Sequence, residues 1–219
     1  MICGANHEDM AAVHGKVYVA SMNMRGARAQ LPAGLDKSAT YIVNATSAQA
    51  TANKNRRDFS PMTAVEGGYK GFWNFESYWQ SGKVWENVPH NTSITWWKAQ
   101  TKPKRRYPDG KGKKVLHAKF EHIPETLNWV ESRKQVYVPE YYELIKEREM
   151  TKHWIDVSKL GKTIVVYDYD GPRKDNGDVD IVEVTVEMLK EKINETKFPF
   201  GHGFVVAATI AGIAYPRYA

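Results

Sequence analysis

The apolar run at 162–167 (KTIVVY) places the strongest constraint on how this chain can fold. Its β-branched residues follow one another without alternation, which is typical of a strand buried on both faces. The stretches 16–23 (KVYVASMN) and 41–46 (YIVNAT) also read as strands. An Asn-Gly turn after the first run leads to another strand at 179–184, so we expect a hairpin or bulged strand pair there.

Apolar residues at helical spacing fill most of the remaining chain. Helices are expected at 47–55, from Asn74 to Pro89, from Thr92 or Ser93 to Pro103, in segments of 114–133 interrupted at Pro124, and at 140–154, 185–194 and 204–213. This order of strands, helices, a strand pair and more helices predicts an α+β fold in which helices predominate. At 219 residues the chain fits one large domain or two small ones, and we favour one.

The charge of the chain points to an anionic partner. A formal net charge of +6 suggests a phosphate-bearing molecule, either a nucleotide or a nucleic acid. The cations are densest at 102–114, where they are Lys102, Lys104, Arg105, Arg106, Lys111, Lys113 and Lys114. A solvated basic loop explains this segment equally well.

Other features narrow the functional classes. A single cysteine, Cys3, leaves no intramolecular disulfide and no cysteine-based zinc site, so we expect a reducing, cytoplasmic location. No apolar run approaches the roughly 20 residues of a membrane span, and the N-terminus lacks a signal-peptide layout, so no membrane partner is expected. The standard phosphate-loop and dinucleotide motifs are absent, and we expect neither a cofactor nor a metal.

One predicted helix face carries groups suited to chemistry. Glu76, Trp79, Gln80 and Lys83 are spaced at i, i+3, i+4 and i+7, so they share one side of a helix for which Asn74 is a plausible N-cap. They offer an acid or base, a stacking surface, a hydrogen-bonding amide and an anion contact. The alternative is that Trp79 packs in the core while the charged residues lie at its rim.

Two other stretches could join this face. Asp168 and Asp170 end an apolar strand beside Arg173, a place where active sites are commonly built. Gly201-His202-Gly203 opens the last helix, whose free N–H groups suit a phosphate. Ordinary turns account for both stretches as well.

The central stretch 76–83 (ESYWQSGK) resembles the E-x-Y-[FW]-Q-x-x-K helix of the NADAR superfamily, whose bacterial members include an N-glycosidase acting on riboflavin-pathway intermediates. Three other segments are similar to family segments in the same order. They are 58–61 (DFSP) for F-S-N-F, 118–121 (AKFE) for A-K-F-x, and 201–203 with the helix that follows for the Gly-rich loop and closing helix. The family's W-G-x-G segment has no clear counterpart.

The resemblance implies a fold, an activity and a set of site residues. It implies a NADAR-like core at 58–219 with a strand-pair insertion near 162–184, and residues 1–57 in the same domain. The implied activity is hydrolysis of an N-glycosidic bond in a nucleotide or ADP-ribosylated substrate, with Glu76 as the catalytic carboxylate and Asp170 as the second acid. The implied substrate-binding residues are Asn74, Trp79, Gln80, Lys83, Arg173, Gly201, His202 and Gly203.

Two other functions fit the same residues. Loss of the W-G-x-G segment would suit a catalytically inactive module that binds a nucleotide or ADP-ribose. The basic segment 102–114 with exposed aromatic residues would suit a nucleic-acid-binding protein.

Overall fold

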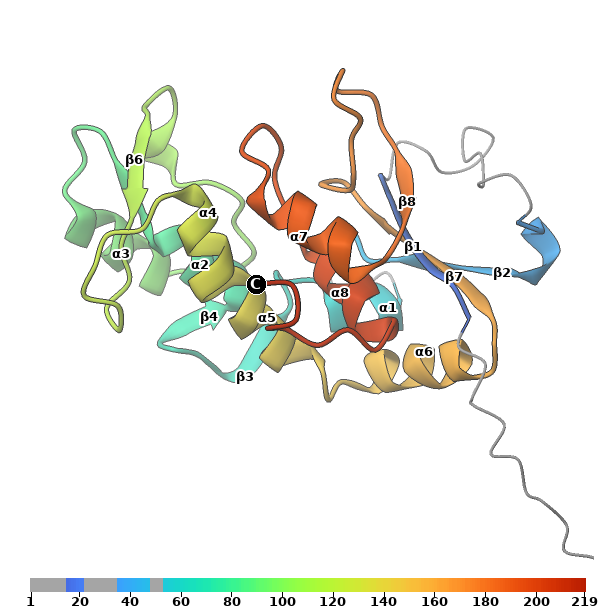
Figure 1. Cartoon of the computed structure of the whole chain (residues 1–219). Helices are drawn as coiled ribbons and strands as arrows, with labels where there is room; N and C mark the ends of the chain where they lie inside the picture. Colours follow the sequence, from blue (N-terminus) through green and yellow to red (C-terminus); the bar gives the residue numbers. More distant parts are fainter. Residues whose placement is uncertain (1–14, 22–34, 48–52) are drawn as a thin grey trace, which may run out of the picture.

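The computed structural model describes residues 15–21, 35–47 and 53–219 (Figure 1). The strands are β1 (Val17–Ser21), β2 (Thr40–Asn44), β3 (Ala64–Tyr69), β4 (Phe72–Asn74), β5 (Lys83–Trp85), β6 (Val115–Ala118), β7 (Thr163–Asp168) and β8 (Ile181–Glu183). The helices are α1 (Lys54–Phe59), α2 (Phe75–Ser81), α3 (His90–Lys98), α4 (Trp129–Ser132), α5 (Val138–Ile145), α6 (Glu149–Lys159), α7 (Val186–Asn194) and α8 (His202–Ile210). A π-helical stretch, Arg133–Tyr137, joins α4 to α5.

The largest sheet has the strand order β2-β7-β1-β8. The apolar run identified in the sequence forms β7, whose Val165 and Val166 are completely buried, so the prediction of a buried strand is confirmed. The predicted hairpin between 162–167 and 179–184 is wrong. β7 pairs in parallel with both β1 and β2, which leaves it no free edge, and β8 pairs antiparallel with β1 instead.

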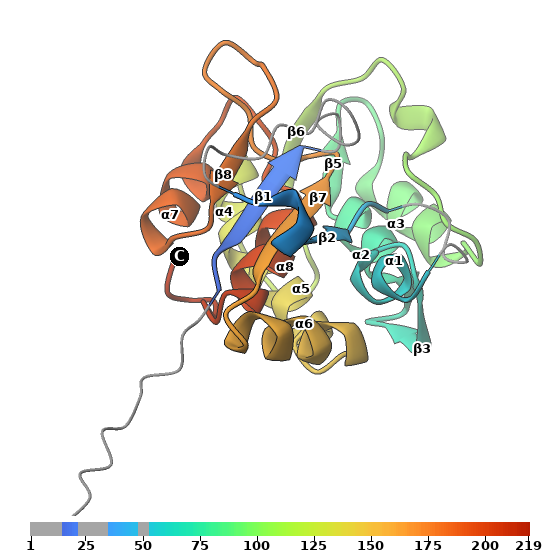
Figure 2. The ribbon, with the colours of Figure 1, turned by 90° about the vertical axis from the view of Figure 1, so that its right-hand side faces the viewer.

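The three parallel strands end at the same edge of this sheet. Ser21 of β1 lies opposite Asp168 of β7, and Asn44 of β2 lies opposite Tyr167. Helix α8 contacts β1 and β7, and Figure 2 looks onto the sheet with α8 behind it. The residues that follow β2 and β7 are thereby brought close to the N-terminus of α8.

Several predicted helix boundaries need correction. The central helix begins after Asn74 as expected but ends at Ser81 rather than Pro89, because the chain enters strand β5. The helical prediction for 114–133 is wrong over its first part, where β6 pairs antiparallel with β5. Of the short helix expected at 47–55, residues 48–52 lie outside the described part, and α1 begins only at Lys54.

The helix expected at 140–154 is two helices. α5 ends at Ile145 and α6 starts at Glu149, with Arg148 between them donating a hydrogen bond to the backbone carbonyl of Asp58. The Asp58 carboxylate also accepts the backbone N–H of Met150 at 2.9 Å. This tertiary contact with Asp58 in the last turn of α1 positions the start of α6. The helices expected at 185–194 and 204–213 are both present, but the second begins at His202 and ends at Ile210.

One main apolar core joins these elements. It extends from Val17 in β1 to Tyr218 near the C-terminus and includes nearly all of α8, which is buried on every side. The chain is therefore an α+β protein with a single domain. Among the described residues, no helix combines the length and apolar character needed to cross a membrane.

A candidate ligand cavity at the end of the parallel strands

A cavity of about 740 Å³ lies where the parallel strands end. Ser47 after β2 and residues 168–170 at the end of β7 line one side of it, and α2, β6 and the π-helical stretch line the others. Ligand sites in sheets with parallel strands commonly lie beyond their carboxyl ends. The volume is in the range of pockets that hold a nucleotide-sized ligand.

Glu76 is the carboxylate that α2 brings to this cavity. Asn74 caps the helix, since its side-chain oxygen accepts the backbone N–H of Ser77 at 2.8 Å, and this leaves Glu76 in the first turn. Gln80, one turn further on, donates Nε2–H to Glu76 Oε1 at 2.8 Å. Burial raises the pKa of Glu76 above its ordinary value, while the Gln80 hydrogen bond and the charge of Lys83 oppose the shift. Glu76 is thus a carboxylate with enhanced basicity.

Lys83 shares the cavity although it lies outside the helix. It is the first residue of β5, and both it and Gln80 line the cavity as the sequence pattern suggested. Burial lowers the pKa of Lys83, an effect that Glu76 opposes and Arg106 adds to. Arg105 and Arg106 are exposed residues of the basic segment that also line the cavity. The side of the cavity that carries Lys83, Arg105 and Arg106 is therefore cationic and can accept an anionic group.

Aromatic rings form another wall. The Trp79 ring lies almost parallel to Phe120, with 6.0 Å between ring centroids, and 4.8 Å from the Tyr137 ring. Gly82 permits this packing, since a Cβ atom there would lie 2.2 Å from the Phe120 ring. Burial and the nearby carboxylates raise the pKa of Tyr137 well above 10, so its hydroxyl remains a neutral hydrogen-bond donor.

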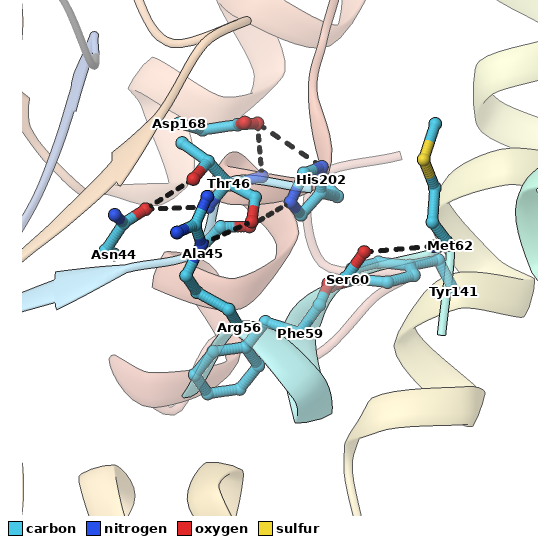
Figure 3. Close-up of polar contacts among 11 residues, drawn as sticks. Asn44, Ala45, Thr46, Arg56, Phe59, Ser60, Met62, Tyr141, Asp168 and His202 are labelled. Carbon is cyan, nitrogen blue, oxygen red and sulfur yellow. Dashed lines mark hydrogen bonds and ion pairs between the residues drawn. The ribbon is translucent and has the colours of Figure 1, made fainter. Parts of the chain in front are cut away.

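A network of fixed polar groups closes the sheet side of the cavity (Figure 3). His202 donates Nε2–H to the carbonyl of Ala45, and its Nδ1 lies 3.5 Å from Asp168 Oδ2. The same Asp168 oxygen accepts the backbone N–H of Gly203 at 2.9 Å. The Asp168 carboxylate therefore occupies the N-terminus of α8, the position the sequence suggested for a phosphate. Both side chains are almost fully buried and serve to hold the loop onto the helix.

Asp170 is the freer of the two aspartates. It lines the cavity with an exposed side chain, and desolvation together with the charge of Asp168 raises its pKa. Gly201 allows the loop to approach, since a Cβ atom there would lie 2.5 Å from Asp168 Oδ2. Asp170 can act as an acid near the cavity mouth.

The structure brings most, though not all, of the expected site residues together. Glu76, Trp79, Gln80, Lys83, Asp170, Gly201 and His202 line the cavity. Asn74 is completely buried as a helix cap, and Gly203 contributes its N–H to Asp168. Arg173 lies outside the cavity lining and donates to the carbonyl of Gly177 at 3.0 Å. Those three are not among the residues that line the cavity.

Other lining residues were not anticipated from the sequence. They include Trp129, the first residue of α4, and Arg133 and Tyr137 at the two ends of the π-helical stretch. No local sequence signal marks a π-helix, although such stretches are frequent at functional sites. The A-K-F segment was a usable signal, since Ala118 and Phe120 both line the cavity.

The described residues contain no group of three or more His, Cys, Asp or Glu side chains that could hold a metal ion. Comparisons of the chain with family models, curated proteins and solved structures found no match.

Proposed function

We propose that this protein hydrolyses an N-glycosidic bond of a nucleotide or ADP-ribose derivative, the activity that the resemblance to NADAR proteins implies. The observation that carries the proposal is the placement of Glu76. Its carboxylate, with a raised pKa, shares one cavity with an aromatic wall and a cationic side. In cleavage of a nucleotide the carboxylate can act at C1 of the ribose, while the aromatic wall can hold the base and the cations can hold the phosphate.

The reaction proceeds through a ribose cation. When the bond between C1 of the ribose and the base nitrogen breaks, its electron pair leaves with the base and C1 becomes oxocarbenium-like. The ionised Glu76 stabilises that charge and takes a proton from the attacking water, whose oxygen bonds to C1. The pKa of Glu76, raised by burial, makes it a stronger base for this step.

Asp170 supplies the proton that the departing base requires. We assign it the acid role: desolvation and the charge of Asp168 raise its pKa, and its protonated form gives the proton to the departing base nitrogen. Exchange with solvent then returns Glu76 and Asp170 to their starting states. Lys83 and Arg106 receive the phosphate of the substrate, and Tyr137 offers an uncharged donor throughout.

Substitution of the carboxylate tests this function. Purified Glu76→Gln is incubated with a panel of ribosylated bases, and free base is measured by chromatography. We expect release by the wild type and a loss of at least about 100-fold in the variant, the scale of a general base. Glu121→Gln is the matched control, because Glu121 is an exposed glutamate whose one ion pair in the described part of the chain is with Lys98 at 3.4 Å. Normal release by Glu76→Gln would refute the assignment.

Nucleic-acid binding is a second candidate. Within the described chain, none of the seven cations at 102–114 forms an ion pair, so all are available to phosphates. If this function holds, affinity for DNA or RNA falls steeply with salt. An affinity that does not change with salt would exclude it. For either function we propose the reducing, cytoplasmic location that a single cysteine suggests.

A further inference from the structure

Exposed apolar side chains gather at the mouth of the cavity. The large apolar residues that are exposed in the described chain are Tyr41, Ile42, Val115, Leu116, Trp129, Leu160 and Tyr169. Four of these seven line the cavity, namely Val115, Leu116, Trp129 and Tyr169. Exposed apolar groups that cluster around a cavity indicate a contact surface for a ligand.

Trp129 is the largest of these groups and is held firmly. It is the first residue of α4, where Asn128 and Glu131 form a reciprocal capping box. The ring centroid lies 4.3 Å from the guanidinium carbon of Arg133. Arg133 itself is 2% exposed and donates to the backbone carbonyls of Ile193, Glu195 and Phe198. The guanidinium is therefore a rigid base beneath one face of the indole.

The other face of Trp129 is available to a ligand. The side chain is 49% exposed even though Arg133 covers one side of the ring. Trp79 is the residue that the sequence suggested as a stacking surface. Its ring is less available to a ligand than that of Trp129, because it already packs against Phe120 and Tyr137 inside the cavity. The stacking surface that remains open is thus at the mouth.

A flat heteroaromatic ring is the ligand group that fits this surface. Bases stack on aromatic side chains whatever their identity, and an indole already held in place loses little rotamer freedom on binding. Arg105 and Arg106 line the same cavity and add charge that favours a phosphate attached to the ring. An uncharged apolar ligand would leave those two cations unused.

We propose that Trp129 is the stacking platform for the base of a phosphate-bearing ligand, located at the mouth of the cavity. The proposal deepens the function above, on which it rests in placing a nucleotide in this cavity. It implies that the substrate has a planar ring besides the bond that is broken.

Two ligands that differ only in the ring test the platform. Binding of AMP and of ribose 5-phosphate to the full chain is measured by calorimetry for the wild type, Trp129→Ala and Trp129→Phe. We expect Trp129→Ala to weaken AMP binding by about 5- to 150-fold and to leave ribose 5-phosphate unchanged. Trp129→Phe should retain most of the AMP affinity. Tyr41→Ala is the matched control, because Tyr41 is 43% exposed and lies outside the cavity lining.

Three results would overturn the platform. They are no binding of AMP by the wild type at millimolar concentration, an unchanged AMP affinity in Trp129→Ala, or an equal loss for both ligands. The measurement is repeated in Glu76→Gln, so that it does not depend on catalysis. If Trp129→Ala binds AMP more weakly but the wild type releases no base, the platform is supported and the hydrolase is refuted. If the wild type releases base but Trp129→Ala binds AMP with unchanged affinity, the hydrolase is supported and the platform is refuted.

Discussion

Replacement of Asn74 by alanine should destabilise the protein more than loss of an ordinary helix cap. The Asn74 side chain is completely buried and makes two hydrogen bonds, accepting the N–H of Ser77 at 2.8 Å and donating to the carbonyl of Met62 at 2.9 Å. Loss of the helix cap costs about 1 kcal/mol of folding stability. Loss of the second hydrogen bond leaves the Met62 carbonyl without this partner, which costs about 1–3 kcal/mol more. We expect Asn74→Ala to lower the free energy of unfolding by about 2–4 kcal/mol.

Asn53 provides the matched control. It caps α1 with a single hydrogen bond of 2.9 Å to the N–H of Arg56, and its side chain is exposed. Asn53→Ala should therefore cost only about 0.5–1 kcal/mol. Urea unfolding followed by circular dichroism measures both variants. Equal losses of stability in the two variants would refute the reasoning.

The raised pKa of Glu76 leads to three further predictions. Because burial raises the pKa of Glu76 and its ionised form is the active one, kcat/KM should fall as the pH drops through a value above 4.5, measured with a buffer series. Lys83→Met removes a cation that holds this pKa down, so the acid limb should move to higher pH; an unmoved limb would contradict the pairing. Glu76→Gln should raise the midpoint temperature of unfolding at pH 7 in calorimetry, because a folded-state pKa above the unfolded one contributes stability at low pH that is lost as pH rises through it. A midpoint at or below that of the wild type would show that the ionised carboxylate is not disfavoured.

Local sequence patterns were sufficient for some of the individual elements. The β-branched run became β7, and the caps Asn74 and Thr185 start the helices expected after them, because strand burial and helix capping depend on neighbouring residues. The i, i+3, i+4 spacing placed Glu76, Trp79 and Gln80 on one face of α2, and all three line the cavity. Lys83 also lines the cavity, but it does so as the first residue of β5 and not as part of the helix.

The pairing of the strands and the assembly of the cavity could be determined only from the tertiary structure. The strand at 179–184 had two partners available in the sequence, and β1 became its partner because β7 was already paired on both edges. Trp129 acquired its place at the cavity mouth through Arg133, whose guanidinium is held by carbonyls about 60 residues away. Such contacts join segments distant in the chain, and no local periodicity encodes them. The residue types and spacing therefore predicted which groups were available for chemistry, and long-range packing selected those that share a cavity.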